Sequence, residues 1–148
     1  MLHNRRMDTA TEFSRLLGPL RRAVMKKARE AASLPDLPDA QISLLRLIAE
    51  SGGVTPGEAA ARFRVAPSTI SNLVRSLRKA ELVERTALAT DLRTVKLTAS
   101  TKAHDLLNCY DRVSAAAIKQ ASKQLSATQQ SELQRAIPVL RALLGALE

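Results

Sequence analysis

The chain has 148 residues, of which 45% are hydrophobic, so it is long enough for one compact domain with a buried core. It carries 23 Lys and Arg against 14 Asp and Glu, a net charge of +9 that favours a polyanionic partner such as nucleic acid. The basic excess lies mainly in residues 1–34 and 55–97. RRM, OB-fold and cold-shock folds are disfavoured, because too few aromatic residues are present to stack on bases: Phe13, Phe63 and Tyr110.

The single cysteine, Cys109, excludes an internal disulfide framework and fits a reducing compartment. We expect a cytoplasmic protein, since no run of about eighteen apolar residues occurs and the N-terminus turns polar where a signal peptide needs its apolar region. No nucleophile–base pair, Gly-rich phosphate loop or carboxylate pair has a supporting context, so we expect no enzymatic activity, cofactor or metal. His104, Asp105 and Cys109 fit a solvated helix surface with a packed thiol better than a metal site.

Apolar residues recur at helical spacing from about Asp8 to Ala32, and the pair Gly18-Pro19 inside this segment predicts a kink. After a turn rich in proline, residues 42–48 predict a short buried helix that closes at Gly52-Gly53. These two segments precede the strongest local pattern of the chain.

Residues 55–79 have the pattern of two helices joined by a short turn. Thr55 can cap the first helix and Glu58 can close a capping box with it. The first helix is expected to break at residues 64–66, and the second to begin at Pro67. The sequence therefore predicts a helix-turn-helix.

The second of these helices has an outer face without acidic residues. Its members can all form hydrogen bonds: Ser68, Thr69, Ser71, Asn72, Arg75 and Arg78. An ordinary solvated face usually includes Asp or Glu, so the composition favours a recognition helix in the DNA major groove over a merely polar surface.

A β-hairpin is predicted directly after the second helix. Residues 82–85 and 94–97 read as two short strands around a loop at residues 86–93. A hairpin in this position is a wing, and we expect Arg93 to enter the flanking minor groove or to contact a phosphate, with Thr94 also at the DNA. Asp91 is expected to play a structural part, by orienting the Arg93 guanidinium or by capping the turn.

Two more helices are predicted, from about residue 99 to residue 124 and from Ser126-x-x-Gln129 onward, with a bend at Pro138. They carry more apolar surface than a small winged domain covers by itself. A second copy of the chain is the commonest solution, and it aligns two recognition helices with half-sites about one DNA turn apart.

Five groups of residues occur in a fixed order: Leu37, Gln41 and Leu45; Thr55, Glu58 and Ala59; Ser68-Thr69-Ile70-Ser71, Leu73-Val74 and Leu77; Leu82-Val83-Glu84-Arg85; and Asp91-x-Arg93 with Leu97-Thr98. In this order and spacing the chain resembles the MarR-type winged helix-turn-helix transcriptional regulators. The chain departs from the family pattern at Glu81 and Thr101, where the family favours Gly, and these changes affect local turns. The resemblance implies a homodimer on a pseudo-palindromic operator and, in many members, a small aromatic or anionic effector.

We therefore expect a mainly α fold with a small β-hairpin wing, integrated into one domain. Residues 1–34 are expected to form an N-terminal dimerisation helix, residues 35–98 the winged helix-turn-helix, and residues 99–148 the C-terminal dimerisation helices. The predicted function is that of a sequence-specific regulator on double-stranded DNA, a dimeric repressor released by a small molecule and without membrane association. Two alternatives stay open: a winged-helix protein-interaction module and a nonspecific architectural DNA binder.

Overall fold

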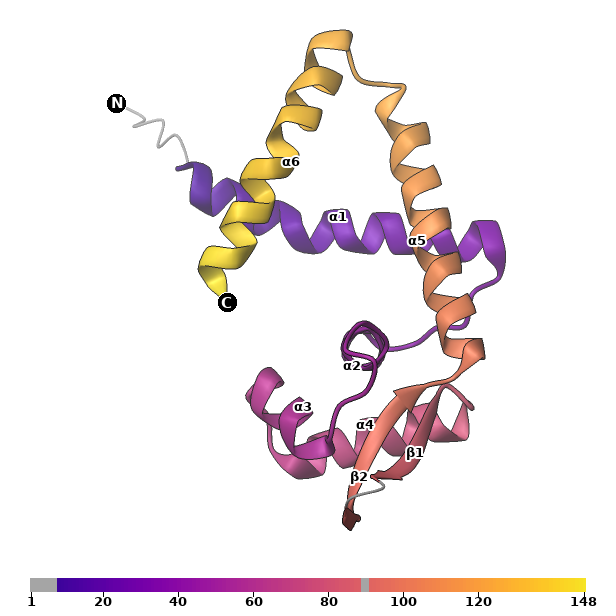
Figure 1. Ribbon diagram of the computed structural model, residues 1–148. Coiled ribbons are helices and arrows are strands. Elements are labelled where there is room, and N and C mark those ends of the chain that lie inside the picture. The colour runs from indigo at the N-terminus through magenta and orange to yellow at the C-terminus, as the bar shows by residue number, and fades with distance from the viewer. Residues whose placement is uncertain (1–7, 89–90) are drawn as a thin grey trace. The chain divides into compact units, whose positions relative to one another are not determined.

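Figure 1 shows the computed structural model of the chain, which describes residues 8–88 and 91–148, and the side chains of all of these except residues 88 and 91–93. The elements follow in the order α1 (Thr9–Ala32), α2 (Asp39–Glu50), α3 (Pro56–Phe63), α4 (Pro67–Lys79), β1 (Val83–Leu88), β2 (Asp91–Ala99), α5 (Thr101–Ser122) and α6 (Ala127–Leu147). The chain divides into two compact units. One is Ala32–Asp111, and the other joins the described residues through Ala31 to Arg112–Glu148. The predicted mainly α fold with a small β-hairpin is confirmed.

The helix-turn-helix forms as the sequence predicts. The backbone N–H of Glu58 donates to Oγ1 of Thr55 at 3.2 Å, and the N–H of Thr55 donates to a carboxylate oxygen of Glu58 at 2.8 Å, so the capping box at the start of α3 is confirmed. The helix ends where Arg64 takes a left-handed backbone conformation, with φ of 52°. A new helix then begins at Pro67, whose fixed φ suits the first helical position.

The core of Ala32–Asp111 draws on α2, α4, both strands and the first half of α5. Its largest fully buried side chains are Leu44, Leu45, Ile48, Ile70, Leu77, Leu82, Leu97 and Tyr110. Two polar contacts join α5 to the beginning of this unit. The hydroxyl of Tyr110 donates to the backbone carbonyl of Pro35, and Arg46 forms an ion pair with Asp111 at 2.5 Å. The Arg46–Asp111 pair joins α2 to α5, and the Tyr110 hydrogen bond joins α5 to the segment before α2.

The hairpin is longer than the sequence predicts. β1 and β2 pair antiparallel from Val83 opposite Ala99 to Ala87 opposite Val95, and the register then shifts so that Leu88 lies opposite Asp91. The prediction of a loop over residues 86–93 is wrong, because residues 86–88 belong to β1 and residues 91–93 to β2. Cross-strand pairing extends both strands beyond the apolar residues that mark them in the sequence.

The unit that contains α1 and α6 buries little of its apolar surface. In α1 the one buried residue is Ala28, and α6 has none. Both helices continue through a proline, Pro19 in α1 and Pro138 in α6, and the kinks expected there stay predictions. The predicted capping box of Ser126 and Gln129 at the start of α6 is confirmed. Across the described part of the chain, none of the helices is both long and apolar enough to cross a membrane.

Candidate nucleic-acid interface

The side chains that α4 presents to a partner depend on which of its faces is buried. Ile70, Val74 and Leu77 recur at helical spacing and are buried in the core, so the opposite face of the helix points outward. The N-cap of this helix is Ala66, which has no side chain able to accept from the first backbone N–H groups. The amino end of α4 is thus compatible with an anion as its cap.

The predicted contact residues of α4 all lie on this outward face. Exposed side chains are found at each predicted position: Ser68, Thr69, Ser71, Asn72, Arg75 and Arg78. No residue of α4 is acidic. Hydroxyl, amide and guanidinium groups can hydrogen-bond to base edges in the major groove and to phosphate oxygens. The exposed face of α4 is therefore chemically suited to double-stranded DNA.

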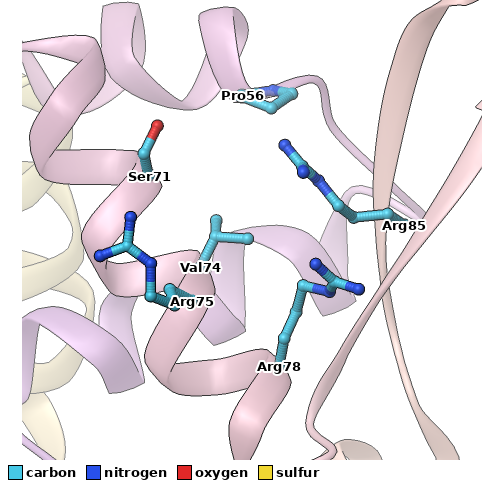
Figure 2. Close-up of a pocket in the computed structure, with 6 residues that line it drawn as sticks. All are labelled: Pro56, Ser71, Val74, Arg75, Arg78 and Arg85. Atoms are coloured by element: carbon cyan, nitrogen blue, oxygen red, sulfur yellow. The ribbon is translucent and has the colours of Figure 1, made fainter.

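A third arginine joins those of α4. Arg85 of β1 lies with Arg75 and Arg78 around a cavity of about 260 Å³. Figure 2 shows the guanidinium group of Arg78 extending from α4 toward the side of the cavity where Arg85 reaches across from β1. The lining is completed by Pro56, Ser71 and Val74. We call Arg75, Arg78, Arg85 and Ser71 the arginine pocket.

Sequence reasoning treated Arg85 only as part of a strand and missed it as a site residue. Its signal is the alternation of side chains along β1. Val83 is buried in the core, and Arg85, two residues later, lies on the same face of the strand and opposite the buried Leu97. Arg85 lies on the core-facing side of β1 but beyond the buried part of the strand, so its side chain lines the cavity beside α4.

Two carboxylates near α3 and α4 are engaged in contacts of their own. Glu58 accepts from Thr55, and the hydrogen bonds from Thr55 hold the pKa of this carboxyl below its ordinary value of 4.5. Glu81, after the end of α4, lies 3.6 Å from the ammonium group of Lys102. Glu58 therefore stays ionised at neutral pH, whereas the charge of Glu81 is partly balanced by Lys102.

The wing residues are placed in part. Thr94 is half-buried in β2. The side chains of Arg93 and Asp91 lie outside the described residues, although both backbones belong to β2. Their backbones fall where the register of the hairpin shifts between Ala87 and Leu88. The roles assigned to Arg93, Thr94 and Asp91 stay predictions.

A helix-turn-helix whose second helix exposes an acid-free polar face, followed by a two-stranded hairpin, defines the winged helix-turn-helix class. Residues 36–94 match the sequence model of the MarR family. The resemblance inferred from the motifs is thereby confirmed for the segment that contains the helix-turn-helix and most of the wing. No curated protein sequence matches the chain significantly.

The solved structures that are similar over almost the whole chain include a transcriptional regulator and two proteins bound to DNA. The transcriptional regulator Tm0710 from Thermotoga maritima is 22% identical, with a TM-score of 0.69 over 92% of this chain and 96% of its own. A MepR mutant from S. aureus, bound to an oligodeoxyribonucleotide, is 19% identical, with a TM-score of 0.68 over 96% and 99%. FabT from Streptococcus pneumoniae, in complex with DNA, is 16% identical, with a TM-score of 0.69 over 95% and 100%. At these identities the likeness shows the fold.

Proposed function

We propose that the protein is a cytoplasmic, dimeric regulator of transcription that binds a specific sequence of double-stranded DNA. The observation that carries this proposal is the outward face of α4, which exposes all six predicted contact residues and no acidic side chain. The MarR-family match over residues 36–94 supports it, as do the DNA-bound structures of MepR and FabT, which share the fold.

The wing and α4 divide the contacts in this proposal. The amino half of α4 reads base edges or adjacent phosphates through Ser68, Thr69, Ser71 and Asn72, and Arg75 and Arg78 extend the contact toward its carboxyl end. Arg93 enters the flanking minor groove, where a narrow, electronegative groove attracts a guanidinium, and Thr94 contacts the backbone beside it. Asp91 serves the structure of the wing.

The dimer in this proposal explains the uncovered apolar surface of α1 and α6. Large apolar side chains stand exposed along both helices: Leu16, Leu17, Leu20, Leu133, Ile137, Val139, Leu140, Leu143, Leu144 and Leu147. Exposed apolar side chains in this number are uncommon on a soluble monomer and mark an interface. A two-fold dimer covers it on both copies at once and gives the two DNA half-sites of a pseudo-palindrome.

We also propose that the bound protein represses transcription and that a small aromatic or anionic molecule releases it. The MarR-family resemblance supports this part of the proposal. A ligand releases DNA only to the extent that it binds the DNA-free conformation more tightly. Small aromatic acids that weaken binding to a duplex, while leaving the protein folded, identify the effector class.

The experiment that tests the proposed function measures binding to a duplex from the region upstream of the protein's own gene, against a scrambled duplex, over a salt series. We expect a steep decrease of affinity with salt, from the release of counterions, together with a marked preference for the native duplex. A steep slope without preference on any upstream fragment indicates an architectural binder. A weak, salt-insensitive response indicates a protein-interaction module and contradicts the proposal.

A further inference from the structure

The arginine pocket brings three positively charged side chains around one cavity. Arg75 and Arg78 come from α4 and Arg85 comes from β1, so two separate elements supply the charge (Figure 2). Like charges on neighbouring side chains destabilise the folded state, since each repels the others. A cluster of this kind is neutralised either by nearby carboxylates or by a bound anion.

Among the side chains that the structure describes, no carboxylate neutralises the three arginines of the pocket. Arg78 and Arg85 form no ion pair with any described side chain, and Arg75 donates to the neutral amide of Asn72 at 3.1 Å. α4 contains no Asp or Glu that could turn toward the cavity. The pocket is therefore suited to an anion from outside the chain.

The groups that line the cavity fit a phosphate. Guanidinium groups present parallel N–H donors that match the oxygens of phosphate, and three of them surround one cavity of about 260 Å³. The hydroxyl of Ser71 adds a neutral donor from the middle of α4. The cavity opens beside the outward face of α4, where a DNA backbone lies if this helix enters the major groove.

We propose that the arginine pocket binds one phosphate group of the DNA backbone at the carboxyl half of α4, with Arg85 as the contact from β1. This inference rests on the proposed DNA-binding function and adds a sequence-independent contact to it. Phosphate contacts fix the position and register of a protein on DNA without reading its bases. The pocket thus sets how deeply α4 enters the groove.

The test compares wild-type protein with the Arg85→Gln and Arg85→Lys variants on a native upstream duplex and on its scrambled counterpart, over a potassium chloride series. For Arg85→Gln we expect the slope of log affinity against log salt to become shallower by about one unit, which corresponds to one lost phosphate contact. Affinity should decrease by the same factor for both duplexes. Arg85→Lys, which keeps the charge, should keep most of the slope.

The matched control is Arg135→Gln, which removes the same charge from the exposed polar side of α6 and should leave the slope unchanged. Because Arg85 has no partner among the described side chains and stands beside two like charges, Arg85→Gln should melt at a temperature no lower than wild type. A lower melting temperature assigns Arg85 a structural part and contradicts the inference.

Three further outcomes separate this inference from the proposed function. If wild-type binding is itself weak and insensitive to salt, the proposed function fails and this inference fails with it. If wild type binds the native duplex with a steep slope that Arg85→Gln leaves unchanged, only this inference is overturned. A changed ratio between native and scrambled duplex shows that Arg85 reads a base, which also overturns it.

A separate experiment tests whether the pocket binds a phosphate of the DNA backbone or free inorganic phosphate. Inorganic phosphate is titrated into the protein–DNA complex at constant ionic strength, with chloride as the reference anion. We expect phosphate to displace the duplex no better than chloride does, because the backbone supplies many further contacts. Displacement of wild type at low phosphate, absent in Arg85→Gln, assigns the pocket to a free phosphate and contradicts a DNA contact.

Discussion

Arg75 and Asn72 are joined across one turn on the exposed face of α4, with Nη1 of Arg75 donating to Oδ1 of Asn72 at 3.1 Å. This bond uses one of the two lone pairs of the Asn72 amide oxygen, and the amide nitrogen and the guanidinium of Arg75 supply the remaining N–H donors of the pair. Donors match the acceptors of guanine in the major groove and the oxygens of phosphate. In the proposed complex we therefore expect the two side chains to contact DNA as one unit.

We predict that Asn72→Ala and Arg75→Ala each weaken binding to the native duplex by about 1–3 kcal/mol, the range for a side chain that hydrogen-bonds to DNA directly. The double variant should lose less than the sum of the two, because removing either side chain already disrupts the shared arrangement. Fluorescence anisotropy with a labelled duplex measures all three affinities. Lys119→Ala, on the exposed surface of α5, is the control and should bind as wild type does. Strictly additive losses contradict the coupling.

The capping box of Thr55 and Glu58 predicts a pH dependence of stability. The pKa of Glu58 is held below its ordinary value of 4.5 by the hydrogen bonds from Thr55. The unfolded chain therefore binds the proton more readily than the folded chain does. The stabilisation from this carboxylate should be fully present above pH 4.5 and lost as pH falls through the folded pKa of Glu58.

Thermal unfolding between acidic and neutral pH tests this expectation in wild type and in Glu58→Gln. The variant should lack the part of the pH dependence that Glu58 supplies, because an amide does not titrate in this range. The capping box at the start of α6 shows that a neutral amide can replace the carboxylate in such a box, since Gln129 accepts from the N–H of Ser126 at 3.0 Å. Identical pH profiles for wild type and Glu58→Gln are the result that would rule out a contribution from Glu58.

Gly53 allows residues 52–54 to approach β2 closely. Its backbone φ of 125° is one that L side chains rarely adopt, and a Cβ added here would lie 3.2 Å from the carbonyl oxygen of Leu97. The next residue, Val54, exchanges both backbone hydrogen bonds with Leu97, at 3.0 and 2.8 Å. Gly53 thus makes room for the bridge that joins the segment before α3 to the wing.

We predict that Gly53→Ala lowers the free energy of unfolding by about 1–3 kcal/mol, the cost of a strained backbone conformation. The matched control is Gly57→Ala in the first turn of α3, where a Cβ meets nothing within 4 Å and φ is helical. That variant should be stabilised by about 0.5–1 kcal/mol, because Ala loses less conformational freedom on folding than Gly. Denaturant titration measures both. Equal effects of the two substitutions would show that Gly53 is under no strain.

The fold was predictable where it depends on neighbours in sequence. Both capping boxes, the break before Pro67 and the buried face of α4 follow from side chains three or four residues apart. The extent of the hairpin was not predictable in the same way. Thr86 and Ala87 join β1 because they pair with Lys96 and Val95, and the alternation of apolar residues that marks the strand in the sequence ends before them.

The candidate site also contains residues that local sequence predicts and one residue that it does not predict. Helical periodicity alone places Ser68, Asn72 and Arg75 on the outward face of α4, because Ile70 and Val74 must point inward. Arg85 could not be assigned to this site from periodicity, since its position beside Arg78 depends on how β1 packs along α4. Contacts between elements decide which basic residues gather, and a single sequence does not report them.

The apolar side of α6 predicts a dimer that can be broken without unfolding the winged helix. Leu133, Ile137 and Leu144 share one side of the helix and are 40%, 46% and 58% exposed in the single chain. We predict that Ile137→Asp combined with Leu144→Asp converts a dimer into a monomer, because each carboxylate would have to be desolvated inside the interface. Light scattering after size exclusion should give the mass of one 16.1 kDa chain for the variant and twice that for wild type.

Arg135→Asp, on the opposite side of α6, adds a carboxylate to the same helix and should remain a dimer. The monomeric double variant should keep the helical circular dichroism of the wild type, since neither substituted residue is buried within its own chain. It should also lose most of its affinity for a duplex with two half-sites, because each copy then binds without the other. A double variant that keeps the dimer mass would show that α6 is covered by something other than a second copy.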